Sequence, residues 1–174
     1  MKTLLLSLTL LSTVAMADGF SLFGPKAGVE PVNNTLYKEE CASCHFAYQP
    51  GLLPKRSWKK LMSNLEDHFG TDASLEPEDR RALLSYLLKH AADTPNAKKR
   101  SRKIAKSIPT NRTPIAVSQT PYFKHEHRKI PKRFIVQKEV RSLSNCMACH
   151  TTADKGIYSE RAIKIPNYGG WDDD

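Results

Sequence analysis

The four cysteines constrain this chain most strongly, because all of them fall in two copies of one five-residue pattern. The copies are Cys41-Ala42-Ser43-Cys44-His45 and Cys146-Met147-Ala148-Cys149-His150. C-x-x-C-H is the attachment pattern of a c-type haem. Two thiols at this spacing reach the two vinyl groups on one edge of a porphyrin, and the next residue places an imidazole under the iron. We therefore expect two covalently attached haem c groups, held by Cys41, Cys44, Cys146 and Cys149, with His45 and His150 as proximal ligands.

Other uses of paired cysteines explain the pattern less well. A thioredoxin-like redox pair needs a βαβ setting, which the sequence does not indicate. A zinc ribbon separates its two pairs by far fewer residues than lie between Cys44 and Cys146. Structural disulfides form in oxidising compartments, but they do not explain the histidine that follows each pair.

Residues 1–17 are expected to form a cleaved signal peptide. A positive start at Lys2 is followed by an apolar run from Leu4 to Val14, and small residues at Ala15 and Ala17 suit a signal peptidase. The run is too short to span a bilayer comfortably, so an uncleaved N-terminal anchor is the weaker alternative. With a mean hydropathy of −0.50, the chain is not a bundle of membrane helices. We expect an exported, periplasmic protein.

Positive charge is concentrated in the middle of the chain. Residues 93–141 hold 14 Lys and Arg against 3 Asp and Glu, a net charge of +11. Such a field attracts anionic partners and speeds their encounter. Export argues against nucleic acid as the partner and favours an acidic redox protein or anionic lipid. A solvated linker face is the alternative explanation.

The supply of side chains favours histidine as the second axial ligand of both irons. Met1 and Met16 leave with the signal peptide, and Met147 lies inside the second motif, so Met62 is the remaining thioether. Four histidines stand outside the motifs, namely His68, His90, His125 and His127. A second imidazole gives the haem a lower reduction potential than methionine would. It also fills the sixth coordination position of the iron, which gas binding or peroxide chemistry needs.

His68 is the candidate for the first haem. The apolar spacing predicts a helix over residues 58–69, with Ser57 as its N-cap and Gly70 after its end. His68 lies on the apolar face of this helix, where it can reach a haem packed beneath. Met62 is expected to fill the core.

The other three histidines are separated less clearly. A further helix is expected with Pro77 in its first turn and His90 near its end, where a histidine acts as a C-terminal cap or a solvated cation. His125 and His127 lie upstream of the second motif, and one of them is expected to ligate the second haem. The residue pattern alone does not separate these two.

The expected fold class is mainly α. Asn33, Asn34 and Thr35 suit the cap of a short helix leading to Cys41, and the order of elements over residues 18–92 is that of a small class I cytochrome c-like haem domain. Within it, the loop over residues 48–54 is expected to fold round the haem edge and to offer a carbonyl to the proximal imidazole.

The rest of the chain is less regular in its pattern. Residues 93–119 carry three prolines and are expected to form a basic linker with one helical turn. Residues 120–174 show little periodicity, and we expect a second haem-binding domain with little regular secondary structure. Its apolar residues are too few for an ordinary core, so we expect it to fold only around its haem.

The sequence resembles the dihaem cytochrome c (DHC) family of bacterial periplasmic electron-transfer proteins. The matching stretches are LYKEEC at 36–41, CHFAYQPGLLP at 44–54, DHFG at 67–70, TPYF at 120–123 and IP at 165–166. The resemblance implies His/His ligation with His68 and His127 as the distal ligands. It also implies electron transfer between a membrane cytochrome b and a small soluble monohaem cytochrome that binds oxygen.

The sequence therefore predicts an electron-transfer protein rather than an enzyme, with a periplasmic dihaem c-type cytochrome as the favoured reading. A dihaem peroxidase-like enzyme is the first alternative, but it needs an open axial site and a longer chain. A gas sensor needs a five-coordinate haem and an output domain. A fixed haem subunit of a membrane redox complex is the third alternative.

Overall fold

A computed structural model describes residues 26–171, so the signal peptide expected over residues 1–17 lies outside the described part. The described helices are α1 (Thr35–Cys41), α2 (Lys55–Met62), α3 (Pro77–Lys89), α4 (Lys99–Ser107), α5 (Pro121–Glu126) and α6 (Lys132–Ile135), and the only paired strands in this range are β1 (Lys164–Ile165) and β2 (Gly169–Gly170). The expectation of a mainly α fold is confirmed. None of the helices over residues 26–171 has the length and apolar character needed to cross a membrane.

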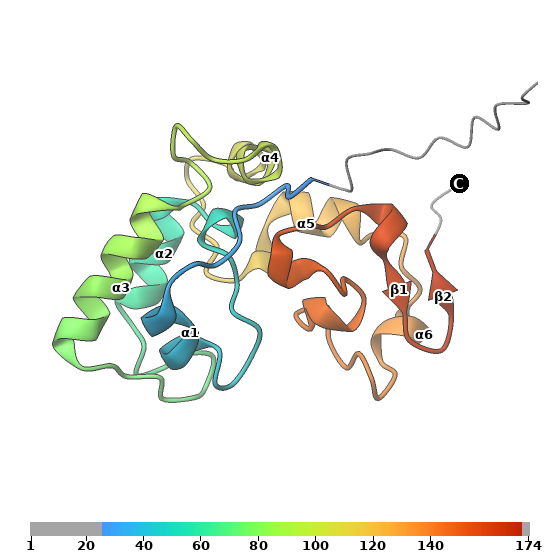
Figure 1. Cartoon of the computed structure of the whole chain (residues 1–174), viewed down its shortest axis with the longest axis horizontal. Coiled ribbons are helices and arrows are strands. Elements are labelled where there is room, and N and C mark those ends of the chain that lie inside the picture. Colours follow the sequence, from blue (N-terminus) through green and yellow to red (C-terminus); the bar gives the residue numbers. More distant parts are fainter. Residues whose placement is uncertain (1–25, 172–174) are drawn as a thin grey trace, which may run out of the picture.

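The N-terminal half is a small helical unit with its own core. Helices α1, α2 and α3 enclose an apolar cluster, coloured blue to green in Figure 1. The buried members of this cluster are Tyr37, Leu53, Trp58, Met62, Leu65, Leu83, Leu87 and Ala91. Asn34 caps α1 as expected, since its side chain accepts the Tyr37 backbone N–H at 2.7 Å. Pro77 opens α3, also as expected.

The helix expected over residues 58–69 is wrong at both ends. Helix α2 (Lys55–Met62) begins before Ser57, whose side chain is buried inside the first turn and does not cap it. Beyond the helix, the Ser63 hydroxyl donates to the Lys60 carbonyl at 2.8 Å. Such local side-chain bonds compete with continuation of a helix, so the chain leaves the helical path before it reaches the histidine.

The C-terminal half has short elements and long irregular segments. Besides α5 and α6 it contains the 3₁₀ turns η3 (Cys146–Ala148), η4 (Ala153–Lys155) and η5 (Glu160–Ala162). The β1–β2 hairpin lies at its edge, and the Lys164 N–H donates to the Cys149 carbonyl at 2.9 Å. Few of its side chains are fully buried. Apolar packing between helices therefore does not account for the shape of this half.

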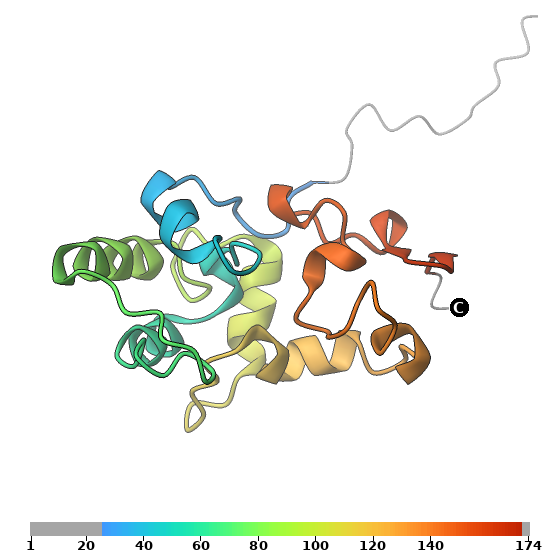
Figure 2. The ribbon, with the colours of Figure 1, turned by 90° about the horizontal axis from the view of Figure 1, so that it is seen from below.

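Helix α4 lies at the junction of the two halves, although its residues belong to the segment expected to be a linker. Figure 2 shows it between the N-terminal elements on the left and the orange and red C-terminal elements on the right. Its inner face buries Ser101 and Ile104. Ile104 joins a second core with Val29, Leu52 from the 3₁₀ turn η1 (Pro50–Leu52), and Ile108. The basic segment is thus packed into the fold.

An N-terminal segment ties the junction together. The N–H groups of Gly28 and Val29 donate to the Gly156 carbonyl at 2.9 and 3.2 Å, and the Arg100 N–H donates to the Gly28 carbonyl at 3.1 Å. Gly156 has φ of +70°, and a Cβ at this position would collide with the Val29 carbonyl. The segment at Gly28 and Val29 therefore contacts both the start of α4, at Arg100, and the C-terminal half, at Gly156.

We predict that Ile104→Ala lowers the free energy of unfolding by about 2–5 kcal/mol, because it opens a cavity in the second core. Chemical unfolding of the haem-loaded chain, followed by circular dichroism, measures this. The matched control is Lys103→Ala, which alters an exposed neighbour on the same helix and should change stability by about 0.5 kcal/mol or less. Equal effects of the two substitutions would show that α4 is an unpacked linker.

Candidate haem-binding sites

The first motif follows α1 directly. Cys41 is the last residue of this helix, and the turn after it exposes Cys44 and His45. His45 Nδ1 donates to the Phe46 carbonyl at 2.8 Å, which leaves Nε2 free to bind a metal. The expectation that the loop over residues 48–54 supplies this carbonyl is therefore wrong.

The loop carbonyls are used elsewhere in the N-terminal half. The Tyr48 carbonyl accepts the Tyr37 hydroxyl at 2.7 Å, and the Pro50 carbonyl accepts the Trp58 indole N–H at 2.8 Å. The loop is thus held onto the first core, and the proximal imidazole takes its partner from the residue next to it.

A tight turn, and not a helix, presents His68. The Asp67 carboxylate accepts the Gly70 N–H at 3.1 Å, and the His68 N–H donates to the Thr71 carbonyl at 2.8 Å. Phe69 and Gly70 both have left-handed backbone, with φ of +57° and +84°. The turn brings the His68 ring opposite His45, with ring centroids 6.1 Å apart and planes inclined by 31°.

The second motif builds a similar pair from different elements. The His150 N–H donates to the Cys146 carbonyl at 2.8 Å, closing the turn that begins at η3. His127 forms the C-cap of α5, and its Nδ1 donates to the Phe123 carbonyl at 2.8 Å. Its ring also stacks on the Phe123 ring at a centroid distance of 3.9 Å. The rings of His127 and His150 lie 6.1 Å apart, with planes at 75°.

Both pairs have the spacing that one iron between two imidazoles requires. Metal–nitrogen bonds are about 2 Å long, so two imidazoles on opposite sides of one iron have ring centroids roughly 6 Å apart. Burial lowers the pKa of His68 and His127, and it lowers the pKa of His150 to about 4. These imidazoles are therefore neutral at pH 7, which is the form that binds a metal.

The second pair lies in an apolar hollow of about 1230 Å³, part of it open to solvent. Cys146, Cys149, His127 and His150 all line it. The apolar side chains around them include Leu52, Ile104, Val117, Ile130, Phe134 and Val140. An enclosure of this kind, with two thiols and two facing imidazoles on its wall, suits a flat, largely apolar group such as haem.

The cysteines lack the electrostatics of a thiolate site. Burial raises the pKa of Cys41 and of Cys146 to about 11, whereas redox-active and zinc-binding cysteines need a lowered pKa. None of the four cysteines is paired in a disulfide. Within residues 26–171, no group of three or more His, Cys, Asp or Glu is arranged to hold a metal ion by itself. The donor set therefore fits a metal that brings its own equatorial ligands.

The remaining candidates lie outside both pairs. His90 forms the C-cap of α3 and contacts the Glu30 carboxylate at 3.2 Å. His125 is exposed beside Glu126, and Met62 is buried in the first core with 3% of its surface exposed.

The sequence analysis missed two side chains that shape the second site. The Arg100 guanidinium lines the hollow and donates to the Tyr122 hydroxyl at 2.8 Å and the Tyr158 carbonyl at 3.0 Å. Its position four residues before Ile104 puts it on the inner face of α4. This spacing is difficult to recognise in the sequence because Arg100 stands within a run of basic residues. Phe123 was detectable in the same way, because it lies four residues before His127.

A helical chain with two such sites has the features of a multihaem c-type cytochrome. The family model for dihaem cytochrome c matches residues 37–158. The diheme cytochrome c from Rhodobacter sphaeroides is 40% identical, with a TM-score of 0.64 over 74% of this chain and 99% of that one. The diheme cytochrome c from Shewanella baltica OS155 is 35% identical, with a TM-score of 0.65 over 80% and 98%. Among curated proteins, none matches the chain.

The chain therefore belongs to the dihaem cytochrome c family. It carries two covalently bound c-type haems, and its class implies electron transfer.

We predict that replacing Cys146 and Cys149 together by serine halves the covalently bound haem, because the first motif still holds its own group. Haem staining of a denaturing gel and the mass of the intact chain measure this. The same variant should lose protease resistance over residues 120–171, since the second hollow loses its filling. Full haem content, or unchanged resistance of this region, would contradict the prediction.

Proposed function

We propose that the chain is a periplasmic electron carrier with two histidines on each iron, His45 with His68 and His127 with His150. The observation that carries this proposal is the 6.1 Å separation of the imidazole rings in both pairs. Haem iron supplies reversible one-electron chemistry. Two imidazoles occupy both axial positions, so this ligation favours carrying an electron over binding gas or peroxide. A peroxidase-like enzyme, which needs an open axial site, is the less favoured function.

The chain's own contribution is to orient the imidazoles, which the structure shows by hydrogen bonds for His45 and His127. The Phe46 and Phe123 carbonyls accept the Nδ1 protons of His45 and His127, which fixes the tautomer and makes each ring a stronger ligand. Stacking on Phe123 further restricts His127. Rings held in this way move little when the charge on a bound iron changes, and such rigidity favours fast electron exchange.

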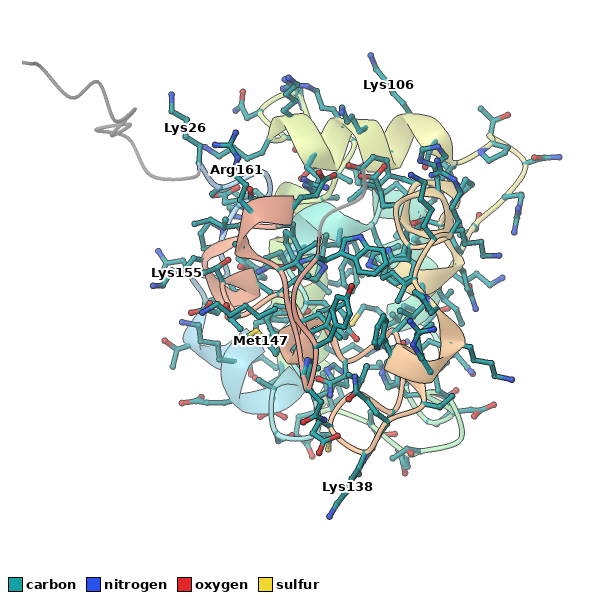
Figure 3. The ribbon with its side chains drawn as sticks, turned by 90° about the vertical axis from the view of Figure 1, so that its right-hand side faces the viewer. Lys26, Lys106, Lys138, Met147, Lys155 and Arg161 are labelled. Carbon is teal, nitrogen blue, oxygen red and sulfur yellow. The ribbon has the colours of Figure 1, made fainter. Side chains whose placement is uncertain are left out.

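For partners, we propose a membrane cytochrome b on one side and a small soluble monohaem cytochrome that binds oxygen on the other. The family resemblance supports this pair, and the basic helix α4 suits an acidic docking surface on one of them. Its exposed cations, together with the preceding residue, are Lys98, Lys99, Arg102, Lys103 and Lys106. Lys106 extends from α4 away from the molecule (Figure 3). The N-terminal pattern over residues 1–17 supports export to the periplasm.

We predict two different low-spin ferric signals in electron paramagnetic resonance, without the charge-transfer band of a methionine–iron bond. The inclination of the two axial imidazole planes sets the splitting of the iron d orbitals. The planes meet at 31° in the first pair and at 75° in the second. The first haem should therefore give a rhombic signal and the second a more strongly anisotropic one. A high-spin component or a methionine band in the wild-type protein would overturn the proposed ligation.

Two neighbouring histidines provide the matched control for this prediction. His127→Ala should remove the more anisotropic signal and produce a high-spin one, because it takes away one axial ligand. His125→Ala, two residues away and exposed, should leave both low-spin signals unchanged. If the His127→Ala protein keeps six-coordinate imidazole ligation at both irons, the assignment of His127 is wrong.

We also predict that electron exchange with a small acidic monohaem cytochrome slows steeply as salt is added, because added ions screen the field of α4. Stopped-flow rates at low ionic strength should fall by on the order of tenfold when Lys99 and Lys103 are both changed to glutamine. Changing Lys59 and Lys60 of α2 removes the same charge from an exposed site elsewhere and should have a much smaller effect. If the electron-exchange rate does not change with salt concentration, α4 has no role in docking.

A further inference from the structure

Two strongly exposed apolar side chains belong to one region of the C-terminal half. Val136 follows α6 and has 61% of its surface exposed, and Tyr168, in the turn between β1 and β2, has 57% exposed. Their sequence neighbours are bonded to each other, since the Asn167 side chain donates to the Gln137 side-chain oxygen at 3.0 Å. Figure 1 places α6 and the hairpin at the right-hand end of the molecule, and Figure 3 turns this end towards the reader.

The wall of the second hollow stands behind these two side chains. The Phe134 ring packs on Tyr168 at a centroid distance of 4.5 Å, and the Trp171 ring lies 6.3 Å from Phe134 and 6.4 Å from Tyr168. Phe134 and Trp171 line the hollow, whereas Val136 and Tyr168 are not part of its lining. The layer therefore has the haem-binding residues on one side and solvent on the other. We call its members, Phe134, Val136, Tyr168 and Trp171, the α6–hairpin face.

Positive charge surrounds the α6–hairpin face. Residues 128–141 contain six Lys and Arg against one Glu. The exposed cations of this segment and of β1 are Arg128, Lys129, Lys132, Arg133, Lys138, Arg141 and Lys164. The Arg133 guanidinium lies over the Phe134 ring at 4.7 Å, and Lys138 extends away from the molecule (Figure 3). An apolar centre within a charged rim is the composition of a protein docking surface.

We propose that the α6–hairpin face docks an acidic redox protein that exchanges electrons with the second haem, an inference that rests on the proposed carrier function. The partner presents carboxylates to the rim and an apolar surface to Val136 and Tyr168. One electron passes between the redox centre of the partner and the second iron, so that one is oxidised as the other is reduced, and no proton moves. Two exposed apolar side chains bury little area, which suits the short-lived complexes of electron carriers.

Helix α4 has a different part in this encounter. Its exposed side chains are all cations, and none of the large exposed apolar side chains of residues 26–171 belongs to it. Charge of this kind speeds the approach of a partner, but exposed ion pairs add little to the strength of the contact. Helix α4 therefore attracts the acidic partner, and the α6–hairpin face holds it beside the second haem.

The position of the face favours a protein over a lipid surface as the occupant. An anionic membrane is attracted to cations and aromatic rings of the same kind. Electron exchange, however, requires the partner to approach a haem closely, and the α6–hairpin face forms part of the wall around the second one. Attraction to lipid does not depend on such a position.

The test follows, by stopped flow, electron transfer from the reduced haem-loaded chain to an oxidised, small, acidic monohaem cytochrome at increasing concentrations of this probe. Changing Val136 and Tyr168 together to serine should raise the half-saturating probe concentration several-fold, because the contact loses its apolar centre. The salt dependence should stay the same. Changing Lys132 and Lys138 together to glutamine should slow association and weaken the salt dependence.

The matched control changes Lys59 and Lys60 of α2 together to glutamine. It removes the same charge from exposed positions away from the face and should alter both quantities much less. A probe of opposite charge provides a second control. A basic monohaem cytochrome of similar size should exchange electrons far more slowly with the wild-type protein, and equal rates for the two probes would overturn the proposal.

Cross-linking with a carbodiimide locates the contact without any variant. This reagent joins a carboxylate of the acidic probe directly to a lysine amine that touches it, and mass spectrometry of the peptides identifies the lysine. We expect links to Lys132, Lys138 or Lys164. Links confined to lysines of α2 or α4 would overturn the proposed face.

The outcomes separate the docking face from the carrier function. If both double variants on the face behave as the wild type and keep two low-spin signals, the face is wrong and the carrier function stands. If the wild-type protein co-sediments with phosphatidylglycerol vesicles, and the variants lose only this binding, the face serves a membrane and the protein partner is wrong. A high-spin signal in the wild-type protein contradicts the proposed ligation instead, whatever the kinetics of docking.

Discussion

A covalently attached haem has to be enclosed by the same short chain that bonds to it, and this requirement shapes the two halves differently. The N-terminal half has an apolar core of its own, and it holds Cys44 and His45 at an exposed edge. The C-terminal half has few buried side chains, and most of them surround the hollow that contains its motif. For the first half the haem adds to an existing core, whereas for the second it supplies most of one.

The same requirement explains why the basic helix is packed and not free. Helix α4 turns Ile104 into the second core and Arg100 toward the second hollow, while its other cations face solvent. One helix therefore closes the second site and carries the positive surface. Burial is the main cause of the low pKa of His150, and the charge of Arg100 adds to it. A cation in this position also stabilises the reduced state of a nearby iron relative to the oxidised state.

Local chemistry made several parts of this structure predictable. Some features depend only on a few adjacent residues and can be recognised directly from the sequence. These are the two motifs, the Asn34 cap and the start of α3 at Pro77. The extension of a helix to His68 failed because Ser63 bonds the backbone locally, a competition that apolar spacing does not register. The packing of α4 was missed because Ile104 and Ile108, four residues apart on one face, stand within a run of cations.

Other features depend on contacts between distant parts of the chain. His125 and His127 are equivalent in pattern, and only the end of α5 distinguishes them, since the C-cap turns His127 back onto Phe123. Family resemblance selected His127 where residue spacing could not. The contacts of Tyr48 with Ser144 and of Gln49 with Ala153 join positions about a hundred residues apart. No local sequence pattern predicts them.

These distant contacts have a consequence for how the two sites are held. The residues that cross between the halves stand directly after the first motif, and their partners flank the second. The spacing between the sites is therefore set by two short segments, 41–49 and 144–153, that also carry the haem-attachment residues. A change of length in the intervening chain, for example at residues 109–116 before η2 (Val117–Gln119), leaves those segments untouched. The separation of the haems can in this way stay constant while the surface that meets a partner changes.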